Sequence, residues 1–241
     1  MRTIQVMPAL ILLGAVCLTQ AAEPSPPPSP DMIVEWLRFG NERHAEGRHV
    51  HWHQSLSRRQ ELATRGESPQ AAIVTCSESA VPPEILFDQG LGDLYVVRVP
   101  GNVVGERELA GVEHAVEHYG VQVVVVLGHR HCSLVAQALR GSGGAGHLGA
   151  IFSSMAAPIA HVKGLAGDVL DRAIQANVET GVATLLEAEP VLAPRVHASR
   201  VRVLGAVYQP ASGQVRWIAP TQSGAAMSST ARPAQGSALP H

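Results

Sequence analysis

Two hydrophobic segments of the chain each end at side chains that bind metals. Residues 71–76 (AAIVTC) end at Cys76, and residues 121–128 (VQVVVVLG) are followed directly by His129 and, three residues later, by Cys132. Short, β-branched, nearly all-apolar segments are typical of strands in a parallel sheet that is covered on both faces. If the two strands are neighbours, these three side chains meet at the carboxyl ends of the strands, where open α/β sheets bind ligands.

Two thiolates and one imidazole form a ligand set that suits zinc, with a fourth position left for a carboxylate or water. We therefore predict a zinc site that contains Cys76, His129 and Cys132. The alternative is a single disulfide between the two cysteines, as an oxidising compartment would permit. Zinc is favoured because each cysteine follows a buried strand and His129 lies three residues before Cys132.

The composition and the N-terminus limit the possible partners and locations. With 241 residues, a formal net charge of −2 and a pI near 6.6, the chain favours one domain and offers no electrostatic basis for binding nucleic acid or an acidic membrane. Arg2 precedes an apolar run at 9–18, and small residues follow at 19–22. This pattern predicts a signal peptide over residues 1–22, and hence a periplasmic or secreted protein that is not membrane-bound after cleavage; an uncleaved anchor is the alternative.

The rest of the chain alternates between expected strands and helices. We expect residues 23–30 to form a Pro/Ser linker, 31–220 the folded domain, and 221–241 a disordered tail. Strands are expected at 71–76, 94–99, 121–128, 201–208 and 215–218. Helices are expected at 55–65, 106–119, 133–139 and 168–187. Two more helices are expected, one that begins near residue 31 and a short one that begins after residue 82. A turn at 210–213 makes the last two strands a hairpin. The order predicts a three-layer α-β-α fold with a mostly parallel central sheet and an antiparallel edge strand.

Three details of this interpretation can be compared directly with a structure. Asp31 is the expected N-cap of the first helix, and Leu56 and Leu62 are expected to face inward from the second. The stretch 43–53 carries four histidines, His44, His49, His51 and His53. A second metal site is conceivable there, but solvated histidines are the favoured interpretation.

The motifs around these residues resemble those of the β-class carbonic anhydrases, over roughly residues 32–219. The resemblance is carried by six segments: residues 76–94, the Gly101-Asn102 turn, residues 116–120, Leu127-Gly128-His129-x-x-Cys132, Ala176-Asn177-Val178 and residues 205–208. It implies a zinc enzyme that interconverts carbon dioxide and bicarbonate, with a homodimer or higher homo-oligomer as the assembly. In such an enzyme zinc activates water for attack on carbon dioxide.

The chain differs from the family pattern beside the first cysteine. The family has Cys-x-Asp-x-Arg, whereas this chain has Cys76-x-Glu78-x-Ala80, and Ser133 replaces a glycine that usually follows the second cysteine. The resemblance implies that a carboxylate at position 78 acts in catalysis when an arginine holds it off the metal, and becomes the fourth metal ligand when it is free. Our hypothesis is that Arg130, beside His129, pairs with Glu78 and replaces the missing arginine.

Three functions are consistent with these residues. The first is an exported carbonic anhydrase with reduced activity. The second is a catalytically impaired, zinc-binding relative with a binding or structural role. The third is a hydrolase for a related small substrate such as carbonyl sulfide.

Overall fold

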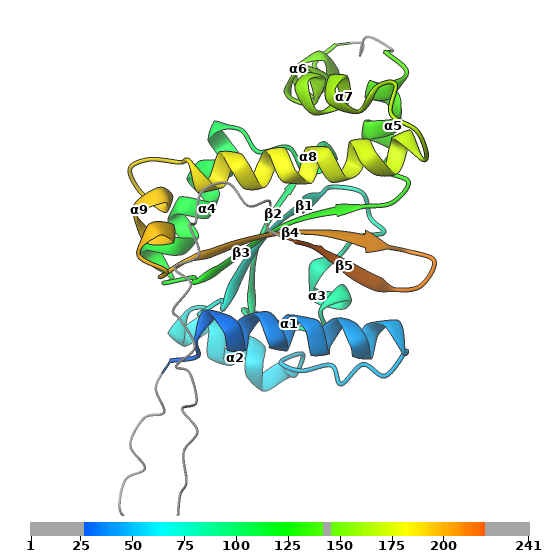
Figure 1. Cartoon of the computed structure of the whole chain (residues 1–241). Helices are drawn as coiled ribbons and strands as arrows, with labels where there is room; N and C mark the ends of the chain where they lie inside the picture. Colours follow the sequence, from blue (N-terminus) through cyan, green and yellow to red (C-terminus); the bar gives the residue numbers. More distant parts are fainter. Residues whose placement is uncertain (1–26, 142–145, 220–241) are drawn as a thin grey trace, which may run out of the picture.

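The computed structural model describes residues 27–141 and 146–219. The predicted signal peptide (1–22), the predicted tail (221–241) and the first half of the predicted linker (23–30) lie outside the described residues. The regular elements run from Pro30 to Ile218 (Figure 1). Within the two described ranges, no helix combines the length and the apolar character needed to cross a membrane.

The core of the domain is a five-stranded sheet in the order β2-β1-β3-β4-β5. The strands are β1 (Ala71–Cys76), β2 (Leu94–Val99), β3 (Val123–His129), β4 (Arg202–Gln209) and β5 (Gln214–Ile218). The first four are parallel, and β5 pairs antiparallel with β4 at the edge. Every residue of β1 and β3 is buried, which accounts for their continuous apolar sequences.

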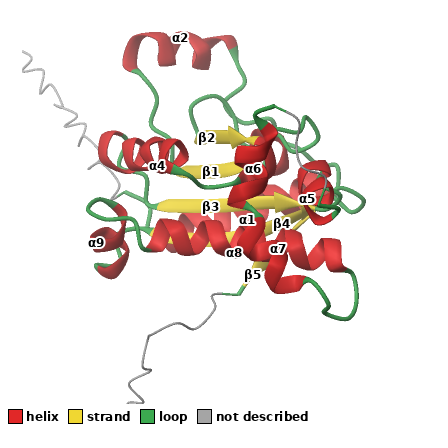
Figure 2. Cartoon of the chain, turned by 90° about the horizontal axis from the view of Figure 1, so that it is seen from above, coloured by secondary structure: helices red, strands yellow, loops and turns green. Residues whose placement is uncertain are grey.

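Helices cover both faces of this sheet (Figure 1). One face carries α4 (Glu106–His118) and α8 (Val169–Leu186), with α9 (Leu192–His197) packed against α8. The other carries α1 (Pro30–Ala45) and α3 (Pro83–Leu86), and α2 (Leu56–Arg65) lies on the same side of the molecule. A short 3-10 turn, η1 (Pro100–Asn102), follows β2, and α5 (Ser133–Leu139) follows β3 at the carboxyl ends of the strands (Figure 2). Two further helices, α6 (Leu148–Ser154) and α7 (Ala156–Val162), lie on the outer side of α8 (Figure 1). The predicted three-layer fold is confirmed, whereas α6, α7 and α9 were not predicted.

The first helix begins earlier than its sequence suggested. Its N-cap is Ser29, whose Oγ accepts a hydrogen bond from the Met32 N–H at 3.3 Å, and Pro30 occupies the first turn. The prediction that Asp31 is the N-cap is therefore wrong. Asp31 lies in the first helical turn and pairs with Arg202 at the start of β4.

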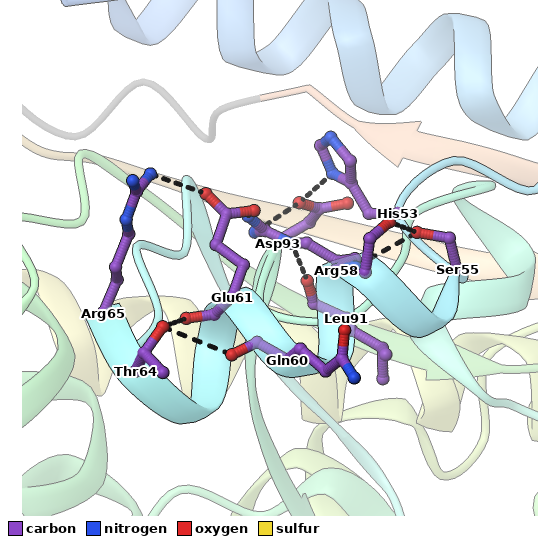
Figure 3. A network of polar contacts seen from close by, with 10 residues as sticks. His53, Ser55, Arg58, Gln60, Glu61, Thr64, Arg65, Leu91 and Asp93 are labelled. Carbon is purple, nitrogen blue, oxygen red and sulfur yellow. Dashed lines mark hydrogen bonds and ion pairs between the residues drawn. The ribbon is translucent and has the colours of Figure 1, made fainter.

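Helix α2 projects beyond the β2 edge of the sheet (Figure 2) and has no buried residue. The expectation that Leu56 faces inward is wrong, because this residue is 60% exposed. Polar contacts hold the helix instead (Figure 3): Arg58 Nε donates to the Leu91 carbonyl at 3.0 Å, and an Arg58 amino group lies 3.7 Å from Asp93. His53 Nδ1 also binds Asp93, at 2.6 Å. Leu62, the other residue expected to face inward, is half-buried beside Gly92. Charge and hydrogen bonding therefore supply much of the attachment of α2, together with this one apolar contact.

Candidate metal centre

The parallel pairing of β1 with β3 brings the two cysteine-bearing segments together. Thr75 lies beside Leu127 in the register, so Cys76 and His129 emerge at the same edge of the sheet. Cys132 follows in the turn that leads into α5. The ligand atoms of Cys76, Glu78, His129 and Cys132 all lie within 4.8 Å of one another, and no other group of this kind occurs among residues 27–141 and 146–219.

The His129 ring is oriented by its own backbone neighbour. Nδ1 lies 3.1 Å from the Arg130 carbonyl oxygen, which can only accept a hydrogen bond, so Nδ1 carries a proton. In the neutral ring Nε2 then carries the lone pair. That nitrogen is buried, has no hydrogen-bond partner and points into the cluster. A buried nitrogen without a partner requires an explanation, and a metal ion at this position supplies one.

The two cysteines are both buried and both free, so the disulfide alternative is contradicted. A hydrogen bond from the Cys132 thiol is the main reason that the pKa of Cys76 is lowered to about 4. The same contact, together with burial, raises the pKa of Cys132. Without a metal the pair is therefore one thiolate and one thiol, and zinc binding has to displace the remaining proton.

The turn after β2 supplies a backbone donor to this thiolate. The Gly101 N–H lies 3.4 Å from Cys76 Sγ, and Asn177 Nδ2 on α8 donates to the Gly101 carbonyl at 2.8 Å. Gly101 has a positive φ of 69°, and a Cβ atom there would lie 2.0 Å from Met155 Cε. The family resemblance singled out Gly101 and Asn177, but their contacts with the cluster became visible only in three dimensions.

Glu78 reaches the cluster through one of its two carboxylate oxygens. Oε1 accepts hydrogen bonds from the Ser133 N–H at 2.8 Å and from Ser133 Oγ at 2.7 Å, whereas Oε2 lies 3.8 Å from His129 Nε2. Partial burial acts to raise the pKa of Glu78, but the two bonds from Ser133 outweigh it and hold the pKa below its ordinary value. The carboxylate is therefore ionised at neutral pH.

Two arginines lie near this loop, and neither is bonded to the Glu78 carboxylate. Arg98 donates to two backbone carbonyls, from Nη2 to Glu78 O at 2.6 Å and from Nε to Cys76 O at 3.3 Å. The predicted pair between Arg130 and Glu78 is wrong. Arg130 instead binds Asp168 at 3.0 Å and Asp171 at 3.5 Å, because two carboxylates in the first turn of α8 attract it more than one carboxylate that Ser133 already engages.

The donor set fits a tetrahedral zinc ion. With zinc–sulfur bonds of about 2.3 Å and zinc–nitrogen or zinc–oxygen bonds of about 2.0 Å, neighbouring ligand atoms lie roughly 3.3–3.8 Å apart. The observed separation of 3.8 Å between Glu78 Oε2 and His129 Nε2 is within reach of that geometry. Two sulfurs, one imidazole nitrogen and one carboxylate oxygen would complete four-coordination.

The histidine-rich stretch has a different organisation from the one expected. His44 is half-buried, and its ring joins His49 at 3.0 Å and the Tyr208 hydroxyl at 3.2 Å. His53 binds Asp93. His44, at the end of α1, is therefore joined to β4, which contradicts the expectation of a simply solvated side chain there. His53 contacts the residue before β2 but remains 51% exposed, as expected.

Comparison with known proteins identifies relatives of this fold and site. Residues 71–215 match a family model described as carbonic anhydrase. The chain is 34% identical over 188 residues to carbonic anhydrase 2 of Mycobacterium tuberculosis, which covers 76% of this chain and 90% of that protein. The β-carbonic anhydrase CafA of Aspergillus fumigatus superposes with a TM-score of 0.61 at 28% identity, covering 69% of this chain and 84% of that one. A tetrameric β-carbonic anhydrase of Sordaria macrospora has the same fold, with a TM-score of 0.60 at 24% identity, covering 75% of this chain and 90% of that one.

Proposed function

Because the chain belongs to the β-carbonic anhydrase family, we propose that it is a zinc enzyme that interconverts carbon dioxide and bicarbonate. The observation that carries this proposal is the convergence of two buried sulfurs with a buried, unpartnered imidazole nitrogen at the carboxyl edge of the sheet. The two sulfurs carry a negative charge in a buried place, and burying such a charge without a cation is costly. A metal ion bound to this set would offset that cost.

Three residues would hold the zinc ion: Cys76, His129 and Cys132. Zinc bound there would supply Lewis-acid activation of water near neutral pH. The remaining contacts support the ligands. The Arg130 carbonyl fixes the His129 ring, and the Gly101 N–H stabilises the negative charge on Cys76.

Glu78 determines whether the fourth position is closed or open. In the structure its Oε2 atom lies among the ligand atoms and would exclude water. When the side chain withdraws, the ionised carboxylate can accept a proton from reacting water. We therefore propose that turnover is reduced, because each cycle requires the side chain to leave its position beside the ligands.

A second function is favoured by the same residue. If Glu78 stays bound, the centre is a closed four-ligand site of the structural type, and the protein is a zinc-binding relative with a binding or structural role. The absence of any arginine or lysine bonded to the Glu78 carboxylate in the described part of the chain supports this alternative.

Metal analysis and kinetics distinguish the two functions. The experiment measures zinc per chain by elemental analysis and carbon dioxide hydration by stopped flow from about pH 6 to 9, with Cys132→Ser as the metal-site control. Our proposal expects one zinc per chain and a rate above buffer that Cys132→Ser abolishes. One zinc with no rate at any pH would support the second function, and no zinc would refute both.

We also propose that the protein is exported and acts as a homodimer or higher homo-oligomer. Export is inferred from the sequence of residues 1–22. Self-association is supported by α1, which exposes Trp36 and Phe39, and by the tetrameric relative from Sordaria macrospora. Cell fractionation and light scattering of the purified chain test these two points; a cytoplasmic full-length chain or a monomer would contradict them.

A further inference from the structure

The Glu78 side chain is held from one side by a single residue. Both hydrogen-bond donors of Ser133, the backbone N–H and the hydroxyl, reach the same oxygen, Oε1, at 2.8 and 2.7 Å. The second oxygen is not used by Ser133 and lies 3.8 Å from His129 Nε2. The two oxygens therefore have separate roles: one is anchored, and the other is presented to the metal ligands.

The place of Ser133 in the fold explains why both donors are available. Ser133 is the first residue of α5, and the N–H groups of a first helical turn have no acceptor within the helix. Its bond to Glu78 therefore does not compete with the helix. Ser133 also follows the ligand Cys132 directly, so the turn that places a metal ligand also places the anchor of Glu78.

No arginine or lysine bonds this carboxylate among the residues that the structure describes, and the imidazole of His129 lies 3.8 Å from Oε2. Arg98 is engaged by the backbone carbonyls of Cys76 and Glu78, and Arg130 is engaged by acidic residues of α8. The side chain of Glu78 is 31% exposed, so it would rotate toward solvent if it were not anchored. The two hydrogen bonds from Ser133 hold Oε1 inward, and Oε2 then faces the His129 ring.

We propose that Ser133 is the positioning residue that directs Glu78 Oε2 into the fourth position of the zinc site. This inference rests on the proposed zinc site but does not depend on catalytic activity. Without the anchor, Glu78 swings away, the bound metal loses its fourth ligand, and external anions gain access to it.

Two substitutions remove the anchor in steps, and a third retains it. Ser133→Ala removes only the hydroxyl, whereas Ser133→Pro removes both donors; proline is tolerated at the first position of a helix, and Cys132, with φ −56° and ψ 117°, has the backbone conformation that a following proline requires. Ser133→Thr keeps both donors. Leu56→Pro is the matched control, because it places proline at the exposed first position of α2, away from the site.

Two measurements read out the position of Glu78. The first is zinc affinity by competition with a chelator: we expect a loss of about 10-fold for Ser133→Ala and up to about 100-fold for Ser133→Pro, with the threonine variant and Leu56→Pro unchanged. The second is the visible spectrum of the cobalt-substituted protein during titration with azide. Wild type should not respond, and Ser133→Pro should show a new spectrum because azide enters the vacated position.

The outcomes separate this inference from the proposed function. If wild type binds one zinc per chain and both serine variants keep its zinc affinity and its lack of azide response, Ser133 does not position Glu78, while the zinc site stands. If wild type binds neither zinc nor cobalt, the inference and the proposed function fail together. If Ser133→Pro folds poorly, the comparison of Ser133→Ala with Ser133→Thr decides the question. Both variants keep the backbone N–H, and only Ser133→Thr keeps the hydroxyl that donates to Oε1.

Discussion

Gly101→Ala should weaken both the fold and the metal site, and a second glycine shows how much of the effect belongs to the site. Gly101 and Gly120 both have φ of 69°. Alanine at such an angle costs roughly 1–2 kcal/mol wherever it occurs. At Gly120, which follows α4, an added Cβ would meet no atom within 4 Å. Gly120→Ala therefore measures the backbone cost alone.

At Gly101 two further effects are added. The new Cβ would lie 2.0 Å from Cε of Met155, a fully buried side chain that would have to move. Overpacking of this kind costs about 1–3 kcal/mol. Any shift of the turn also disturbs the Gly101 N–H that donates to Cys76 Sγ. We expect Gly101→Ala to lower the free energy of unfolding by about 1–3 kcal/mol more than Gly120→Ala does, and to lower zinc affinity about 10-fold.

The assay is urea unfolding of both variants with the metal removed by a chelator, followed by a separate zinc competition titration. Measuring the metal-free protein first is necessary because bound zinc itself stabilises the folded state. Equal losses of unfolding free energy in the two variants, together with equal zinc affinities, would refute the role assigned to the Gly101 turn.

Three further predictions concern the surroundings of the site. Asn177→Ala leaves the Gly101 carbonyl without its 2.8 Å partner, so it should cost about 1–3 kcal/mol of stability in urea unfolding and lower zinc affinity. Zinc affinity should rise with pH by about tenfold per unit near neutrality, measured by competition titration, because the pKa of Cys132 is raised and zinc must displace its proton; a flat profile would contradict the thiol–thiolate pair. Arg130→Ala breaks a partly exposed pair with Asp168, so zinc affinity should stay unchanged and unfolding should shift by at most about 1 kcal/mol. A large loss of zinc in this variant would restore the hypothesis that Arg130 acts at the metal.

The sequence was sufficient to predict the position of a residue where that position depends only on the strand that carries the residue. The continuous apolar runs of β1 and β3 identified both as central strands, and parallel neighbours bring their ends to one edge. That logic correctly anticipated that Cys76, His129 and Cys132 lie together. It requires no knowledge of side-chain partners elsewhere in the chain.

Prediction from the sequence was poorer where packing or short elements decide the outcome. The six-residue α9 and the seven-residue α6 and α7 are too short to show a helical period, and proline occurs within α7 and α9. Leu56 begins a helix with an amphipathic sequence, yet α2 lies beyond the sheet edge and has no buried residue. The position of α2 depends on the contact between its own Arg58 and Asp93, two residues that lie far apart in the sequence.

The partners of Glu78 and Arg130 show the same limit at the site itself. Arg130 directly follows His129, a predicted metal ligand, and this neighbourhood was the reason for pairing it with Glu78. The first turn of α8, 38 residues away, offers Arg130 two carboxylates instead. Ser133, 55 residues from Glu78, supplies the donors that the guanidinium does not. The partner of each side chain depends on which helices begin at the carboxyl edge of the sheet, and the local sequence does not contain that information.

These partners also set the charge of the proposed centre. Zinc with two thiolates is formally neutral, and an ionised Glu78 among the ligands makes the centre anionic. Neither guanidinium nearby offsets this charge, because Arg98 binds carbonyl groups and Arg130 binds the acidic residues of α8. Two neutral hydrogen bonds hold a carboxylate less strongly than a bidentate guanidinium does. If the proposed zinc site is correct, an anchor of this strength would keep Glu78 beside the metal ligands at rest and still release it, so our proposal predicts that the strength of the Ser133 contact sets the balance between metal retention and turnover.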